Sequence, residues 1–178
     1  MLERRANPVG RAATAGIPRI TLGGLRIAVL NLEQTADFMI DLVFPSRQVT
    51  RPLYLTSANG EVLARCSTEP MTDQLFRAAD LINADGQPLV TVSRLKSPLP
   101  LPERVATTDL FHVVASKAEA TGLTFYMFGA DEAENSAAVA NVRRTYPRLR
   151  IVGNCHGYLR GDALRAKVDE IIINFRLR

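Results

Sequence analysis

The sequence has few of the features that would place it in a class at once. Its 178 residues include only two cysteines, Cys66 and Cys155, which form neither a C-x-x-C motif nor a pair at metal-ligand spacing. This argues against a disulfide scaffold or a zinc module, so we expect two reduced, structural thiols without a redox role. No apolar run is long enough to cross a bilayer. The sequence therefore predicts a soluble or peripheral protein.

Neither the composition nor the charge is extreme. A hydrophobic content of 47% excludes a disordered chain, and 178 residues suffice for one domain with a buried core. The net charge of +4 favours anionic partners. However, the arginines are scattered among acidic residues and form no basic stripe, so we expect no nucleic-acid partner. Phosphates of a nucleotide sugar and anionic lipid headgroups both fit this charge.

Short apolar runs alternate with helical patterns over most of the chain. This alternation predicts an α/β fold, a Rossmann-like open, mostly parallel sheet with helices on both faces. A short N-terminal hairpin precedes it, because Gly23 and Gly24 separate two alternating runs. We expect a flexible basic tail over residues 1–18, which are rich in Arg and Ala, and one α/β domain over residues 19–178. The absence of a G-x-G-x-x-G fingerprint disfavours a nucleotide-binding oxidoreductase.

The segment 81–90 organises the rest of the chain. It is an apolar run that ends on Asp85 and Gly86, with Pro88 two residues on. A buried strand would bring Asp85 to its carboxyl end, Gly86 would allow a tight exit, and Pro88 suits the first turn of a helix. Ligands bind at that edge of α/β sheets. The alternative is an ordinary helix N-cap, which on these residues alone is the commoner role of aspartate.

Other turns are expected at the same edge. Ser57 and Asn59 follow a strand predicted at 53–56, and either could face a ligand or cap the next helix. Gly129 follows the clearest buried strand, predicted at 123–128, and precedes a helix, an arrangement that favours a phosphate site although one glycine is not a G-x-G-x-x-G fingerprint. The proline-rich segment 97–105 cannot be helix or central strand, so we expect an ordered loop that crosses toward this edge.

Together these turns resemble the WecG/TagA/CpsF family of bacterial glycosyltransferases. The resemblance runs from about Ile20 to the end of the chain. The matching stretches occur in the family's order and nearly at its spacing: residues 56–61, 79–86, 102–105 with Asp109, 128–130, and 151–153 with 156–158. With this resemblance, a role at the ligand-binding edge becomes as well supported for Asp85 as helix capping.

The resemblance implies an inverting glycosyltransferase, a hexosyltransferase that moves a sugar from a UDP-sugar onto a polyprenyl-diphosphate-linked saccharide. In the family the aspartate that matches Asp85 is proposed as the general base, a role that suits a carboxylate within reach of the acceptor hydroxyl. Arg104, with backbone N–H groups after Gly129, is our candidate for stabilising the UDP leaving group, and a loop salt bridge is the alternative for Arg104. The substrate-binding candidates are Thr56, Ser57, Asn59, Arg104, Asp109, Gly129, Ala130 and His156.

No D-x-D pair of the kind that binds a divalent cation is present, so we expect no metal and no cofactor. The resemblance implies exopolysaccharide or cell-envelope polysaccharide synthesis in the cytoplasm, at the inner face of the bacterial plasma membrane. It leaves the donor sugar open between an N-acetylmannosamine type and glucose. Apolar surface left by a missing segment would favour self-association into a homo-oligomer.

Two departures from the family pattern stand out. Thr107 occupies a position where the family usually has glycine. The resemblance also implies a further strand and a basic segment that this sequence lacks, so we expect a C-terminally incomplete domain. The alternative function is therefore a catalytically inactive, nucleotide-binding remnant of the family.

Overall fold

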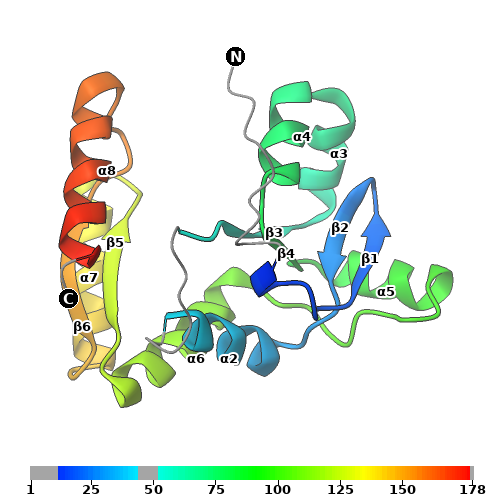
Figure 1. The fold of residues 1–178 in the computed structure, drawn as a ribbon, viewed down its shortest axis with the longest axis horizontal. Coiled ribbons are helices and arrows are strands. Elements are labelled where there is room, and N and C mark those ends of the chain that lie inside the picture. Colours follow the sequence, from blue (N-terminus) through cyan, green and yellow to red (C-terminus); the bar gives the residue numbers. More distant parts are fainter. Residues whose placement is uncertain (1–11, 44–51, 177–178) are drawn as a thin grey trace. The chain divides into compact units, whose positions relative to one another are not determined.

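The computed structural model describes residues 12–43 and 52–176 (Figure 1). The chain divides into two compact units, residues 1–114 and 115–178, and the boundary falls within one helix, α6. Strands and helices alternate, which confirms the predicted α/β class. Along the chain the elements are β1 (Arg19–Leu22), β2 (Leu25–Ala28), α2 (Leu32–Val43), β3 (Leu55–Ala58), α3 (Gly60–Thr68), α4 (Pro70–Arg77), β4 (Leu81–Ala84), α5 (Gln87–Lys96), α6 (Thr107–Thr121), β5 (Thr124–Phe128), α7 (Glu132–Thr145), β6 (Arg150–Cys155) and α8 (Gly161–Arg176).

The predicted N-terminal hairpin is confirmed. β1 and β2 pair in antiparallel fashion, with Ile20 opposite Ile27. Gly23 and Gly24 have φ angles of +54° and +81°, the positive values that a two-residue hairpin turn requires. Because side chains alternate between the faces of a strand, Ile20 and Ile27 enter the core, where they are 9% and 0% exposed.

The first unit contains a parallel strand pair. Leu55 of β3 lies opposite Leu81 of β4, and Ala58 lies opposite Ala84. All four residues of β4 are buried, as expected of an apolar run in a parallel sheet. The crossover between the two strands passes through α3 and α4. β3 ends two residues later than the predicted strand, so Ser57 belongs to the strand and not to the turn that follows it.

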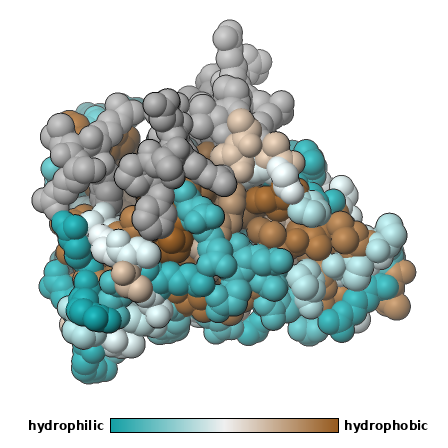
Figure 2. Space-filling model, turned by 60° about the horizontal axis from the view of Figure 1, so that its bottom comes forward, coloured by the Kyte–Doolittle hydropathy of each residue, from teal (hydrophilic) through white to brown (hydrophobic). Residues whose placement is uncertain are grey.

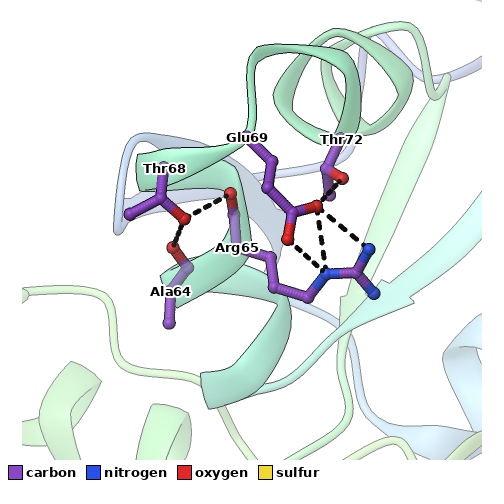
Figure 3. A network of polar contacts seen from close by, with 5 residues as sticks. All are labelled: Ala64, Arg65, Thr68, Glu69 and Thr72. Atoms are coloured by element: carbon purple, nitrogen blue, oxygen red, sulfur yellow. Dashed lines mark hydrogen bonds and ion pairs between the residues drawn. The ribbon is translucent and has the colours of Figure 1, made fainter.

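Glu69 fixes the corner between α3 and α4 (Figure 3). It ends α3 and begins α4, and its carboxylate lies 3.0 Å from Nη2 of Arg65 and 2.6 Å from Oγ1 of Thr72. The Thr68 hydroxyl donates to the backbone oxygens of Ala64 and Arg65. The hydrogen bonds from Arg65 and Thr72 lower the pKa of Glu69 below its ordinary value, so the carboxylate stays charged at this corner.

The proline-rich segment is an irregular, ordered loop, as predicted. Leu101 is 1% exposed, and its N–H donates to the Oγ of Ser93 on α5 over 2.9 Å. Ser93, which is fully buried, donates in turn to the carbonyl of Val90. At the end of the loop, Val105 donates to the carbonyl of Ala84 over 2.7 Å. The core of the first unit therefore fixes the loop beside the carboxyl end of β4.

The core of this unit joins the hairpin, β4, α3, α5 and the loop. Burial of its apolar side chains is the main term that stabilises the unit. Its fully or largely buried members are Ile20, Leu22, Leu25, Ile27, Ala58, Cys66, Ile82, Ala84, Leu89, Val90 and Leu101. Both cysteines carry free thiols, and burial raises the pKa of Cys66.

The second unit contains the parallel pair β5 and β6, against which α7 packs. The predicted strand at 123–128 is present, but its expected burial is wrong. Four of its residues are half-buried and Phe128 is 42% exposed, because a two-stranded sheet gives each strand only one neighbour. Tyr126 lies opposite Gly153, where an added Cβ would approach the ring to 2.5 Å. Gly153 therefore leaves room for the Tyr126 side chain.

The helices α4 and α6 begin at Pro70 and Thr107. Of the predicted tail, residues 1–11 lie outside the described residues, residues 12–13 are helical, and residues 14–17 form a turn and a bend. None of the helices in the described ranges has both the length and the apolarity needed to span a membrane.

Candidate active site

Asp85 lies directly after the carboxyl end of β4. Its N–H donates to the carbonyl of Ala58 over 2.9 Å, which extends the parallel pairing of β3 and β4 by one residue. Ser57 lies opposite Asn83 in this pairing, so the two side chains share one face of the pair with Asp85, two residues beyond Asn83. The sheet edge thus holds Ser57 and Asp85 close together, as the sequence predicted.

A chain of hydrogen bonds links Asp85 to Ser57 through Thr107. Oδ2 of Asp85 accepts from both the backbone N–H and the hydroxyl of Thr107, each over 3.3 Å. The Thr107 hydroxyl is also 2.7 Å from that of Ser57. Because Thr107 is the first residue of α6, the carboxylate lies at the positive end of this helix. In the part of the chain that the structure describes, Oδ1 of Asp85 has no hydrogen-bond partner and can accept a proton from a substrate hydroxyl.

Asp85 does not cap the helix that follows it, so the capping alternative is wrong. The N-cap of α5 is Gly86, which has no side chain to make the bond, and Pro88 lies in the first turn as predicted. The expected need for glycine at this exit is also wrong. Gly86 has φ 178°, an extended value that any residue adopts, and an added Cβ would make an ordinary contact, 3.5 Å from Cβ of Asn59.

Asn59 lies next to Gly86 at the same edge. It is the N-cap of α3, and its Oδ1 accepts from the N–H of Val62 over 2.9 Å. The capping role weighed for Asn59 is therefore confirmed, and its exposed side chain also borders the site. Thr56 comes one residue before Ser57 on β3, so it faces the opposite side of the strand pair.

Arg104 and Asp109 pair with each other at the start of α6. Nη2 of Arg104 lies 3.1 Å from Oδ2 of Asp109, and the two side chains are 49% and 55% exposed. The salt bridge weighed as an alternative for Arg104 is thus present. The guanidinium keeps further donors for a phosphate, since it has five N–H groups. The preceding residue, Glu103, accepts from the N–H of Leu32 over 2.7 Å and so ties this loop to the start of α2.

The second unit brings together the other predicted residues. Gly129 and Ala130 have positive φ angles of +147° and +56°, and Gly157 donates to the Ala130 carbonyl over 2.8 Å. An added Cβ on Gly157 would lie 3.1 Å from Cα of Gly129, so a larger residue would have to move the two turns apart by a few tenths of an ångström. Nδ1 of the half-buried His156 accepts from the N–H of Tyr158 over 3.2 Å. In the neutral imidazole the ring proton is therefore on Nε2.

Asn135 holds these two turns in place. Its buried Nδ2 donates to the carbonyls of Met127, Gly129 and Cys155 at 3.0 to 3.3 Å. Its Oδ1 accepts from Nδ2 of Asn154 over 2.8 Å. One side chain of α7 thus connects the ends of β5 and β6.

The structure groups the predicted residues into two sets. Ser57, Asn59, Asp85, Arg104 and Asp109 belong to the first unit, and Gly129, Ala130 and His156 belong to the second. Among the described residues, no three His, Cys, Asp or Glu side chains are arranged to hold a metal ion.

The sequence patterns did not identify two residues that take part in these sites, Thr107 and Asn135. The signal in the sequence was that Thr107 replaces a glycine, and this did not identify the side chain that its hydroxyl contacts. Asn135 had no such signal, because a polar residue in a polar helix is usually exposed.

The chain is similar in sequence to proteins of a known family. The model of the glycosyl transferase WecG/TagA/CpsF family matches residues 20–176. A protein of Bacillus spizizenii, named N-acetylglucosaminyldiphosphoundecaprenol N-acetyl-beta-D-mannosaminyltransferase, is 29% identical over 118 residues, which are 66% of this chain and 45% of the relative. A protein of the same name from Staphylococcus aureus is 26% identical over 140 residues, 75% of this chain and 54% of the relative. The chain spans about half the length of the curated relatives it matches.

Proposed function

Since the chain belongs to the WecG/TagA/CpsF family of glycosyl transferases, we propose that it carries out inverting transfer of a sugar from a UDP-sugar to a polyprenyl-diphosphate-linked acceptor. The names of the relatives favour N-acetylmannosamine as the sugar and a lipid-linked N-acetylglucosamine as the acceptor. The reaction would belong to synthesis of cell-envelope polysaccharide at the cytoplasmic face of the membrane.

The observation that carries this proposal is the Asp85 carboxylate. One oxygen is held by two donors of Thr107, and the other is left for a substrate. A general base needs this arrangement, because its position must be fixed while one lone pair still points at the proton to be removed. Ser57 and Asn59 border the same edge and offer polar groups for the acceptor or donor sugar.

The proposed step is a single displacement. The acceptor hydroxyl gives its proton to Oδ1 of Asp85 as its oxygen attacks the anomeric carbon from the face opposite UDP. The new glycosidic C–O bond forms while the bond to the β-phosphate oxygen breaks, and its electron pair leaves with UDP. Cationic and N–H donors must stabilise that charge. Arg104 is the proposed cation, and no metal or cofactor is needed in this scheme.

A transfer assay tests the proposal directly. The purified chain is incubated with UDP-N-acetylmannosamine and a short-chain, water-soluble N-acetylglucosaminyl diphospholipid, without and with magnesium. We expect UDP release coupled to formation of a disaccharide lipid, at the same rate in both conditions. UDP binding without any product would support instead a nucleotide-binding remnant, and absence of both would refute the proposal.

Arg104→Ala is expected to weaken UDP binding about tenfold, because a charge-assisted hydrogen bond to phosphate is lost. Calorimetric titration with UDP measures this. Asp109→Asn is the matched control: it removes the salt-bridge partner but keeps the cation, so UDP binding should be unchanged or tighter. Equal weakening by both substitutions would show that the pair only shapes the loop.

Thr107→Val is expected to lower the transfer rate about tenfold, because the carboxylate loses one of two donors and Ser57 loses its partner. Thr107→Ser restores the hydroxyl and should retain nearly the full rate. The comparison is made by steady-state kinetics, with thermal unfolding as a check on stability. Similar rates for both variants would mean that the backbone N–H alone positions Asp85.

A further inference from the structure

The end of α5 exposes an apolar face. Val92, Leu95 and Leu99 are 40%, 81% and 46% exposed, at spacings that place the first two on one side of the helix and the third just beyond its end. The opposite side of α5, with Leu89 and Val90, is buried in the core. Brown surface lies at the right of Figure 2, the side on which α5 lies in Figure 1. This helix therefore has one face in the core and a second apolar face in solvent.

Basic side chains flank this face. Arg94 and Lys96 are both exposed, and as the sequence neighbours of Leu95 they project about 100° to either side of it. No acidic residue occurs in residues 86–102 or in the hairpin, residues 19–28. A groove of about 450 Å³ between β1 and α5 continues the surface, with Leu22, Val92 and Lys96 in its lining.

We propose that this surface of α5, comprising Val92, Arg94, Leu95, Lys96 and Leu99, docks on an anionic membrane. Exposed leucines between cations, without acidic residues, suit insertion at the headgroup level of anionic lipids. A second copy of the chain is a poorer occupant, since it would place the same cations face to face. The choice of a membrane rests on the proposed function, because a lipid-linked acceptor brings the enzyme to one.

The position of the surface also fits that function. α5 begins two residues after Asp85, and its ten residues span about 15 Å. The docking end is thus one helix length from the proposed base. A membrane at that end would bring lipid-linked saccharides close to the edge that holds Asp85.

The test is sedimentation with sucrose-loaded vesicles of phosphatidylglycerol and phosphatidylcholine, compared with phosphatidylcholine alone. We expect binding to the anionic vesicles that weakens in high salt. Two double variants should each weaken vesicle binding about tenfold. One combines Leu95→Ser with Leu99→Ser, and the other combines Arg94→Gln with Lys96→Gln. The matched controls are Leu75→Ser on α4, 56% exposed, and Arg143→Gln with Arg144→Gln at the end of α7.

Three outcomes would overturn the proposal: no binding to anionic vesicles, equal losses in the controls, or self-association that Leu95→Ser abolishes, which would make a second copy the occupant. Transfer to the water-soluble acceptor separates this proposal from the proposed function. It should be the same in the Leu95→Ser variant as in the unmodified chain. Loss of vesicle binding while this activity stays intact tests the docking surface alone. Absence of activity on the soluble acceptor tests the proposed function alone.

Discussion

Replacing Asp85 with asparagine is expected to lower the rate of sugar transfer about 10²- to 10⁴-fold, the usual contribution of a general base. Asparagine has nearly the same shape, and its amide oxygen can still accept from the N–H of Thr107. It cannot take a proton from the acceptor hydroxyl. The loss should therefore appear in the chemical step, while UDP binding changes by no more than about twofold.

Single-turnover transfer and calorimetric titration with UDP measure these two quantities. Asp162→Asn is the control, because it makes the same change of charge on the exposed first turn of α8, where the side chain is 97% exposed. This variant should behave like the unmodified chain. Undiminished turnover in Asp85→Asn would rule out Asp85 as the base, and lost UDP binding would place the carboxylate against the donor instead.

The sequence was sufficient to predict Asp85 at the edge of the sheet because the signal there is local. The four residues before it, three of them apolar, form a fully buried strand, and Pro88 marks the helix that follows. The hairpin was predictable for the same reason, since two adjacent glycines at positive φ leave the chain few alternatives. Where a short run of residues determines the backbone, pattern alone succeeds.

The partner of Asp85 could not be predicted in this way. Thr107 lies 22 residues further on, and its position depends on how the intervening loop packs. That packing rests on burial of Leu101 and on the hydrogen bond from its N–H to Ser93. These are long-range contacts without periodicity, so the sequence showed an unusual residue at position 107 but not the carboxylate that it contacts.

The second unit shows a different limit. The apolar run 123–128 predicted a fully buried strand, but the run alone does not say how many neighbours the strand has. Asn135 lies among Glu134 and Ser136 in a helix whose sequence reads as exposed, although it is only 5% exposed. Its burial depends on the turns that end β5 and β6, which tertiary contacts alone bring to the helix.

Asn135→Leu is expected to reduce the free energy of unfolding by about 2 to 4 kcal/mol, because three backbone carbonyls and the Asn154 amide lose their buried partner, while leucine keeps the branching of the side chain at Cγ. Urea unfolding measures the loss. Asn141→Leu, an exposed position on the same helix, should change stability by less than about 0.5 kcal/mol.

Amide hydrogen exchange locates the effect within the chain. The N–H groups of Gly129 and Gly157, which bond to Cys155 and Ala130 across the two turns, should exchange faster in Asn135→Leu and not in Asn141→Leu. A loss of stability without faster exchange at these glycines would mean that Asn135 supports α7 and not the turns. If both quantities change as expected, one buried amide holds the two turns that carry Gly129, Ala130 and His156, and a substitution at a residue that itself has no proposed contact with a substrate would disturb all three together.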